Sequence, residues 1–250
     1  MTGASPDTLA TTRLPLGGRT ALVTGASRGI GRATAERLAE AGARVGLLSR
    51  SVDALARAAE EIGKGAVAIR CDVSRPESVR AATERFVEAF GEPPDVLVNN
   101  AGLFHLQSVE ETSALDFART LETNLVAPFL FARAFVAAMR GRGRGHIVTI
   151  GSIADRVTFP ENGAYAASKY GLRALHEVMR AELRGSGVRT TLVSPGPVDT
   201  PLWDPVAPDT RPGFTPRSAM LSPTAVADAV LYAVTCPPAV NVDELRITRS

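Results

Sequence analysis

The chain has 250 residues, of which 45% are hydrophobic and 22% charged, and its formal net charge is +2. This length suits one large α/β domain or two small ones, and so small a charge gives no reason to expect a nucleic acid or an anionic membrane as partner. The two cysteines, Cys71 and Cys236, are too few for a disulfide framework and lack the spacing of metal ligands. We therefore expect a soluble, cytoplasmic protein without a metal site.

Residues 1–18 lack the apolar stretch of a signal peptide, and we interpret them as a disordered N-terminal extension. No later run approaches the roughly 20 apolar residues that a membrane span requires. Positive charge comes almost wholly from arginine, because Lys64 and Lys169 are the only lysines. Residues 19–250 show no break in composition and are predicted to form one domain.

Short apolar runs alternate with longer stretches of helical period. The expected strands are Thr20–Thr24, Arg44–Ser49, Ala66–Cys71, Asp95–Asn99, His146–Ile150, Arg189–Val193 and a weaker Glu244–Thr248. The expected helices are Ile30–Ala41, Val52–Ile62, Pro76–Phe90, Leu115–Arg140 (broken near Asn124), Gly163–Arg184 and Pro223–Val234. Apolar runs of about five residues between helices are typical of buried parallel strands. The alternation predicts an α/β fold: a single-domain, Rossmann-like, doubly wound parallel sheet with helices on both faces.

Helix-start signals accompany two of these helices. Ser74 before Pro76, and Ser222 before Pro223, are predicted to be N-caps. Between the last strands, Pro195–Met220 is rich in proline and indicates a long loop of the kind that often forms a lid or a binding loop. The glycine/arginine segment 140–145 resembles an RNA-binding sequence, but its place directly before a buried strand favours a solvated turn.

A glycine-rich turn joins the first strand to the first helix. It contains Gly25, Gly29 and Gly31, with Ser27, Arg28 and Ile30 between them. Free backbone N–H groups and the helix dipole at such a turn can hold a phosphate, and glycine allows the close approach that a pyrophosphate needs. The strict G-x-G-x-x-G spacing is not met, so a tight turn without a ligand stays open. The position in the fold favours a dinucleotide.

The end of the second strand bears on the choice of nicotinamide cofactor. An acidic residue there would hold the ribose 2′-hydroxyl of NAD, but Ser49-Arg50 stands in its place. A guanidinium can pair with a 2′-phosphate, and Arg28 could approach the same phosphate from the other side. NADP(H) is therefore the expected cofactor, against the alternative that both are ordinary surface arginines.

The strongest local signal is the pair Tyr165 and Lys169, four residues apart and so on one face of a helix. A phenol has an ordinary pKa near 10, and a neighbouring ammonium lowers it. The pair therefore predicts a general acid/base that also donates a hydrogen bond to a carbonyl oxygen. An exposed helical pair without function is the alternative.

Taken together, these motifs resemble those of the short-chain dehydrogenase/reductase family, in its short single-domain branch. The motifs are the glycine turn 24–31, Asn99-Asn100-Ala101-Gly102, Tyr165-x-x-x-Lys169 and Pro195-Gly196-Pro-Val198-Asp-Thr200. Their order and separations match, and the resemblance covers residues 18 to 250. It implies a hydride transfer between a nicotinamide and an alcohol/carbonyl pair. The glycine spacing is also the family's own.

The resemblance also implies a role for each matching position. Ser152 would hydrogen-bond the substrate oxygen, Asn124 would hold a relay water near Lys169, and Lys169 would also bind the nicotinamide ribose. Residues implied to contact the dinucleotide are Gly25, Ser27, Arg28, Gly29, Ile30, Gly31, Ser49, Arg50, Asp72, Val73, Asn100, Ala101, Gly102, Tyr165, Lys169, Pro195, Gly196, Val198 and Thr200. The segment Pro195–Thr200 would cover the nicotinamide.

Simpler interpretations remain for the weaker members. Ser152 could be only a cap, Asn124 only a helix break, and His105 only a surface residue. Phe104, Phe159, Trp203 and Phe214 could line a pocket, although packing in the core is the more common role for any one of them. For the whole protein, a nucleotide-binding sensor or scaffold without chemistry is the alternative from another class. An epimerase or dehydratase would need a larger substrate-binding part than this length allows.

The sequence says little about the substrate. The tail Val240–Ile247 is similar to that of family members acting on 3-hydroxy acids and small alcohols. A carboxylate substrate would want a basic residue near the pocket, for which Arg156 and Arg211 are candidates. The family commonly forms homotetramers or dimers through its long helices, so a homo-oligomer (tetramer or dimer) is expected.

Overall fold

The computed structural model describes residues 14–250, and within them a single parallel sheet of seven strands runs in the order β3-β2-β1-β4-β5-β6-β7. The chain builds outward from β1 through β2 to β3, then returns to the centre and builds through β4 to β7 in the other direction. The carboxyl ends of β1 and β4 therefore flank the point where the strand order reverses, which is where doubly wound sheets bind their ligands.

The strands are β1 Thr20–Thr24, β2 Arg44–Ser49, β3 Val67–Arg70, β4 Val96–Asn99, β5 Gly145–Ile150, β6 Val188–Pro195 and β7 Glu244–Ile247. The helices are α1 Gly29–Glu40, α2 Val52–Ile62, α3 Pro76–Phe90, α4 Ala114–Leu121, α5 Ala127–Arg142, α6 Gly163–Glu182 and α7 Pro223–Thr235. A π-helical segment, η1 Glu122–Val126, joins α4 to α5, and short 3-10 helices lie at Ile153–Asp155 (η2), Pro201–Val206 (η3) and Arg217–Ala219 (η4).

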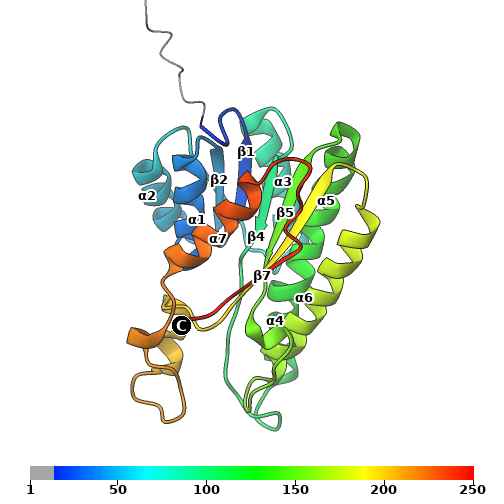
Figure 1. The fold of residues 1–250 in the computed structure, drawn as a ribbon. Helices are drawn as coiled ribbons and strands as arrows, with labels where there is room; N and C mark the ends of the chain where they lie inside the picture. Colours follow the sequence, from blue (N-terminus) through cyan, green and yellow to red (C-terminus); the bar gives the residue numbers. More distant parts are fainter. Residues whose placement is uncertain (1–13) are drawn as a thin grey trace, which may run out of the picture.

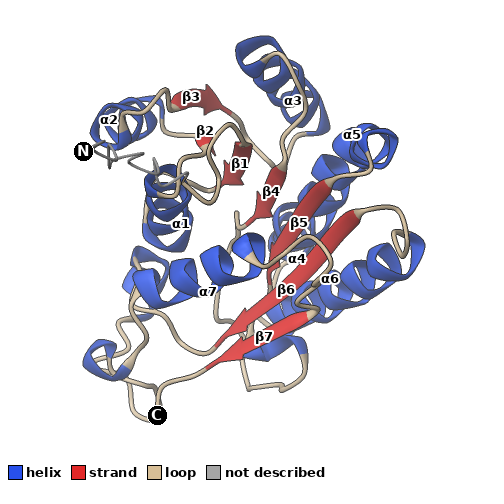
Figure 2. Ribbon diagram, turned by 45° about the horizontal axis from the view of Figure 1, so that its top comes forward, coloured by secondary structure: helices blue, strands red, loops and turns tan. Residues whose placement is uncertain are grey.

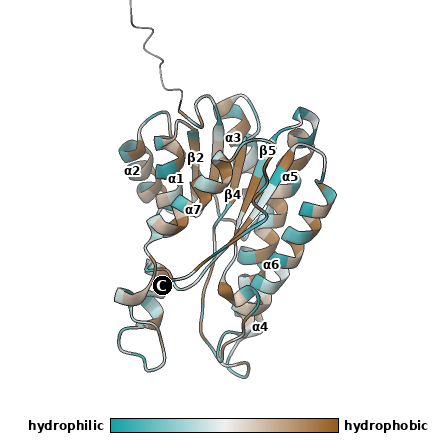
Figure 3. Cartoon of the chain, viewed as in Figure 1, coloured by the Kyte–Doolittle hydropathy of each residue, from teal (hydrophilic) through white to brown (hydrophobic). Residues whose placement is uncertain are grey.

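Helices cover both faces of the sheet. Helices α1, α2 and α7 lie on one face, and α3, α4, α5 and α6 lie on the other (Figures 1 and 2). Neighbouring residues of a strand point to opposite faces, so Val23 packs under α1 and α7 while Leu22 packs with Phe86 and Phe131. Figure 3 shows the central strands as largely hydrophobic, with hydrophilic residues on the outward faces of the helices. This burial is why the strands are continuous apolar runs.

The predicted fold class is confirmed, and most predicted elements lie within a residue or two of those observed. Two predictions are wrong in detail. The helix expected to break near Asn124 is continuous from Ala114 to Arg142. The irregularity near Asn124 is the wider π-helical turn of η1, which does not interrupt the helix. Ser74 is not an N-cap, because its hydroxyl donates to Asp72 and α3 begins after Arg75; Ser222 caps α7 as expected, accepting from the Ala225 N–H.

The continuous helix Ala114–Arg142 is long and apolar enough to cross a membrane by length and composition alone, which the sequence analysis did not anticipate. In the fold, α5 packs beside α3, and α4 and η1 pack against α6. Asn124 of η1 is fully buried and bonds to Ser168 of α6. Its apolar window is 33% buried in the fold, and these contacts with α3 and α6 give the helix a structural role.

The predicted N-terminal extension falls only partly on described residues. Residues 1–13 lie outside them. The turn Leu14–Gly17 is described, and there Leu16 is buried and donates its N–H to the Ala41 carbonyl at the end of α1. The boundary of the domain at residue 19 stays a prediction.

Two buried histidines predict how stability depends on pH. Burial, aided by nearby arginines, lowers the pKa of His146 to about 3 and that of His176 to about 4, where each bonds a threonine hydroxyl. The unfolded chain takes up protons near pH 6.5 and the folded chain does not, so stability is retained above that pH and lost below it. At pH 5 each histidine should cost roughly 2 kcal/mol of unfolding free energy relative to pH 7.

Urea denaturation at pH 7 and pH 5 measures this loss. In His176→Gln, which keeps a hydrogen-bonding group but does not titrate, the loss between the two pH values should shrink by about one histidine's share. An unchanged loss in that variant would contradict the assignment.

Candidate active site

A cavity of about 1410 Å³ opens at the carboxyl ends of the strands, between the glycine turn, the start of α6 and the segment after β6. Every residue predicted for catalysis or cofactor binding, except Gly31 and Asn124, lines this one cavity. Residues separated by up to 175 positions in the sequence, from Gly25 to Thr200, are thus brought to one surface. The two exceptions are buried directly behind it.

The glycine turn has the backbone that its residues predict. Gly25 and Gly29 have φ values of +68° and +59°, in the left-handed region that favours glycine. A Cβ on Gly31 would lie 2.4 Å from both the Gly25 carbonyl oxygen and the Asn100 amide nitrogen. Gly31 therefore lets α1 start directly beneath the turn, which explains its place behind the cavity wall.

A brace between β1 and β4 holds this turn in position. The Asn100 side chain donates to the Thr24 carbonyl at 2.8 Å, and the Thr24 hydroxyl accepts from the N–H groups of Asn100 and Ala101 at 2.9 and 3.0 Å. The Asn100–Gly102 segment is thereby fixed against the glycine turn. In this structure Asn100 supports the wall as well as lining it.

The start of α1 fits an anionic ligand. Among the described residues, no side chain caps this helix at Arg28, and its first turn contains no acidic residue. The first N–H groups of a helix need partners, and the helix dipole favours negative charge there. A pyrophosphate would supply both needs, and the cavity wall includes Ser27, Gly29 and Ile30 around this point.

Two arginines stand at the end of the cavity beside β2. Arg28 and Arg50 are exposed, and both line the cavity together with Ser49 and Asp72. Burial opposes ionisation of Asp72, but hydrogen bonds from Ser74 and the positive charge of Arg50 outweigh it and lower the pKa of this carboxyl. Arg50 therefore lies close enough to act electrostatically on this end of the cavity.

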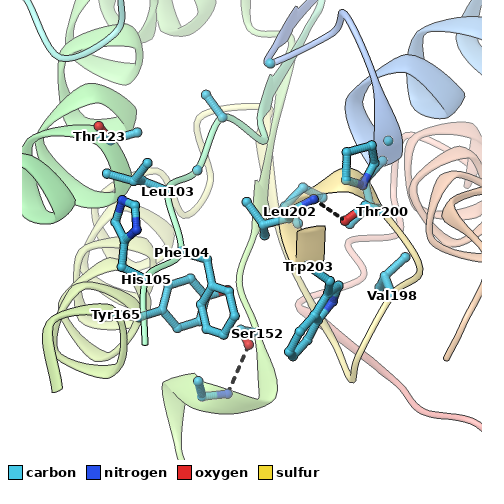
Figure 4. Close-up of a pocket in the computed structure, with 18 of the residues that line it drawn as sticks. Leu103, Phe104, His105, Thr123, Ser152, Tyr165, Val198, Thr200, Leu202 and Trp203 are labelled. Atoms are coloured by element: carbon cyan, nitrogen blue, oxygen red, sulfur yellow. Dashed lines mark hydrogen bonds between the residues drawn. The ribbon is translucent and has the colours of Figure 1, made fainter. Parts of the chain in front are cut away.

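Three of the predicted catalytic residues meet in the middle of the cavity. Tyr165 and Lys169 come from the first turns of α6, and Ser152 follows β5 and caps η2, its hydroxyl accepting from the Ala154 N–H. The Lys169 ammonium is buried, donates to the Ile150 carbonyl at 2.9 Å and lies 5.6 Å from the centroid of the Tyr165 ring. Figure 4 shows Tyr165 and Ser152 on the same side of the pocket.

The protonation of this pair differs from the prediction. Burial raises the pKa of Tyr165 to about 12; the Ser152 hydroxyl opposes this rise and the charge of Asp155 adds to it. Burial lowers the pKa of Lys169 to about 8, although the same carboxylate favours the ammonium. The expected lowering of the phenol pKa is therefore not seen in this structure, because burial is the largest effect on Tyr165.

Asn124 lies behind the catalytic helix. Its side chain accepts from the Leu103 N–H at 2.7 Å, and donates to the Leu103 carbonyl and to the Ser168 hydroxyl, both at 2.9 Å. It thus connects the turn after β4 to α6, one residue before Lys169. The relay role implied by the family resemblance stays a prediction.

Asp155 is a residue that sequence reasoning missed. It is 1% exposed, accepts from the Ser194 hydroxyl at 2.6 Å and pairs with Arg156 at 2.7 Å. Arg156 also bonds Glu244 of β7. An acidic residue three positions after Ser152, just past an apolar strand, was the available signal, and its charge acts on both Tyr165 and Lys169.

An aromatic wall borders the catalytic residues. Phe104 packs edge-on against Tyr165 with ring centroids 4.8 Å apart, and Trp203 packs against Phe104 at 5.0 Å (Figure 4). Phe159 and Phe214 also line the cavity, as do His105 and Arg211. The interpretation of these aromatic residues as core packing is therefore wrong, except that Phe104 is also largely buried. Arg156 lies outside the cavity wall.

The segment after β6 covers part of the cavity. Its Thr200 methyl lies close to Gly29, since a Cβ on that glycine would be 3.2 Å away. Arg217 bonds Asp199 and Asp204, which holds η3 against the end of β6. The proline-rich loop is thus a structured cover with two short 3-10 helices. Residues 14–250 contain no cluster of three or more His, Cys, Asp or Glu that could hold a metal ion.

Comparison with known proteins gives the family. The profile described as short chain dehydrogenase matches residues 19–211. D-threitol dehydrogenase of Mycolicibacterium smegmatis is 36% identical over 87% of this chain and 86% of its own. A metagenomic short-chain oxidoreductase in complex with NADP has a TM-score of 0.81 at 34% identity, covering 94% of this chain and 99% of its own. A 3-ketoacyl-(acyl-carrier-protein) reductase from Brucella melitensis, complexed with NADH, has a TM-score of 0.83 at 28% identity, with 93% and 98% covered.

The chain therefore belongs to the short-chain dehydrogenase/reductase family, as its motifs predicted. It is an oxidoreductase that acts on alcohols and carbonyl compounds of small size and binds a nicotinamide cofactor.

The packing around Gly31 predicts the effect of one methyl group. Gly31→Ala would press the Gly25 carbonyl and the Asn100 amide, so the turn must shift and the nicotinamide cofactor should bind at least about tenfold more weakly. Fluorescence titration with NADPH measures the dissociation constant. Gly141→Ala, where a Cβ meets nothing within 4 Å, is the control. Wild-type affinity in Gly31→Ala would show that the turn does not hold the dinucleotide.

Proposed function

We propose that this protein is an NADP(H)-dependent oxidoreductase that interconverts an alcohol and its carbonyl by hydride transfer, with Tyr165 as the acid/base. The observation that carries the proposal is one cavity lined by the glycine turn, by Arg28 and Arg50, and by Ser152, Tyr165 and Lys169. A protein that only binds a dinucleotide would need the glycine turn and the two arginines but not the other three residues. A half-buried phenol and a buried ammonium beside them are suited to proton transfer.

The dinucleotide would extend along the whole cavity. Its pyrophosphate would lie on the N–H groups at the start of α1, and a 2′-phosphate would pair with Arg28 and Arg50. Asp72 and Val73 would border the adenine, and the ribose next to the nicotinamide would bind Tyr165 and Lys169. The other walls would be formed by Asn100–Gly102 and by Pro195, Gly196, Val198 and Thr200. When bound, the cofactor supplies or accepts the hydride.

The protein's own side chains would manage the proton. Ser152 donates a hydrogen bond to the substrate oxygen and orients it beside the Tyr165 hydroxyl. With a pKa of about 12, the phenol is protonated and can donate its proton to an oxygen that gains negative charge. Lys169, held by the Ile150 carbonyl, places a positive charge near that phenol and helps it to carry negative charge afterwards. Asn124 fixes the turn at Leu103 and would hold the relay water.

The same proposal includes a homo-oligomer, a dimer or a tetramer, in the cytoplasm. Leu115, Phe117, Val126 and Phe129 on the α4–α5 helix are exposed, as are Tyr170 and Val178 on α6. Apolar side chains gathered on adjacent helices often mark an interface between subunits. Light scattering of the purified protein tests this, and a monomer at micromolar concentration would contradict it.

Replacing Tyr165 tests the chemistry. In Tyr165→Phe the hydroxyl is lost while the ring still packs against Phe104, so turnover should fall at least about 100-fold and NADP(H) should still bind. The assay is NADPH oxidation over a panel of carbonyl compounds, with thermal shift for binding. Tyr232→Phe, at an exposed position of α7, is the matched control. Near-full activity in Tyr165→Phe would end this mechanism, and no turnover by the wild type would favour a sensor or scaffold.

Replacing Arg50 tests the choice of cofactor. Arg50→Asp removes a positive charge from the expected 2′-phosphate site and adds a carboxylate that can bond a ribose hydroxyl. The ratio of kcat/KM for NADPH to that for NADH should fall at least about tenfold. Arg57→Asp makes the same change of charge on the exposed part of α2. If both variants change the ratio equally, the effect is one of net charge and the assignment of Arg50 is wrong.

A further inference from the structure

The substrate end of the cavity has a wall of aromatic side chains. Phe104 and Trp203 lie edge-to-face beside Tyr165, and Trp203 lies 6.5 Å from Phe214, also edge-to-face. The three side chains come from two segments, the turn after β4 and the cover after β6, and they meet only in the folded chain. Such a wall binds apolar and aromatic groups through burial and ring contacts.

The arginine at this end is already paired. The Arg211 guanidinium lies over the Phe214 ring, 4.8 Å from its centroid, and forms an ion pair with Glu161. Glu161 also lines the cavity and lies in the loop before α6. A second anion would have to compete with this carboxylate, and the competition disfavours a charged substrate.

The other arginine proposed for a carboxylate substrate is further from the cavity. Arg156 bonds the buried Asp155 and Glu244 of β7 and does not line the wall. Removing it from this network would take the nearest positive charge from the buried Asp155 carboxylate, which is costly even though Ser194 still donates to that carboxylate. Neither Arg156 nor Arg211 is therefore available to a substrate carboxylate, and the hydroxy-acid prediction has no support from these two residues.

We infer that the substrate is an uncharged ketone or aldehyde, or the corresponding alcohol, that carries an aromatic or bulky apolar group seated against Phe104, Trp203 and Phe214. The inference rests on the proposed function and narrows it. The carbonyl would lie at Ser152 and Tyr165, and the apolar group would lie under the cover. The pair Arg211–Glu161 acts at the mouth as a filter against anions.

The chain offers its own reporter for this site, because Trp203 is the only tryptophan in the sequence. Its fluorescence is recorded while the full chain, with NADP⁺ present, is titrated with 1-phenylpropan-2-one or with 4-(2-oxopropyl)benzoate. These ketones differ by one carboxylate. A ketone and an oxidised cofactor cannot exchange a hydride, so the signal reports binding alone; free N-acetyltryptophanamide corrects for absorption by the ligand.

We expect the uncharged ketone to bind at least about tenfold more tightly than the carboxylated one. The uncharged ketone should also have the higher kcat/KM with NADPH. For the same reason, kcat/KM for ethyl acetoacetate should exceed that for acetoacetate. Phe214→Ala should weaken binding of the uncharged aryl ketone about tenfold. Tyr232→Ala, on the exposed face of α7, is the control. Equal or tighter binding of the anion would overturn the inference, and a site that uses Arg119, on the α4 wall of the cavity, would give that result.

The variant Glu161→Gln tests whether the Arg211–Glu161 ion pair disfavours anions. The change frees Arg211, so the discrimination between the two ketones should shrink at least about threefold, and Glu161→Gln/Arg211→Gln should restore it. Discrimination that is unchanged in Glu161→Gln would overturn the role of the ion pair. If no carbonyl compound is reduced, the proposed function fails, whereas the fluorescence titration still decides the inference.

Discussion

One buried ammonium group connects the catalytic helix to the sheet. Lys169 is 5% exposed, and its charge is stabilised by the Ile150 carbonyl at the end of β5 and by the nearby Asp155 carboxylate. A buried charge is costly unless it is hydrogen-bonded, so the position of α6 relative to β5 is closely defined by this contact. Tyr165 lies one helical turn away and Ser152 two residues past the strand. The geometry of the catalytic residues thus depends on where one lysine can be buried.

Asp155 extends the same constraint to the edge of the sheet. It bonds Ser194 in β6 and, through Arg156, is linked to Glu244 in β7. The last strand is short and only partly buried, yet it supplies a charge that helps to hold the turn carrying Ser152. Electrostatic support therefore runs from β7 to the cavity through residues that do not touch it. In this fold the C-terminal strand belongs to the active-site architecture.

The sequence was sufficient for the elements and for most of the cavity wall. Strands β1 and β2 and helices α2 and α3 have the predicted bounds, because their apolar pattern covers the full length of each element. The sequence was not sufficient where contacts between distant residues determine the role of a side chain. Glu244, the second partner of Arg156, lies 88 residues away, and Glu161, the partner of Arg211, lies 50 residues away, so only the fold shows that both arginines are paired. Likewise, the Ser74 hydroxyl donates a hydrogen bond to Asp72 and therefore does not cap α3.

The raised pKa of the Tyr165 phenol also depends on contacts between distant residues. These contacts link the catalytic pair to the substrate. Spacing on a helix places Lys169 near Tyr165, but it does not reveal that Phe104 packs on the phenol ring and Trp203 packs on Phe104. These rings shield part of the phenol from solvent, and burial is the largest cause of its raised pKa. The same rings favour an apolar group beside the reacting carbon. The raised pKa of the acid and the inferred preference for an uncharged substrate are therefore both linked to one feature, the aromatic wall that the cover after β6 completes.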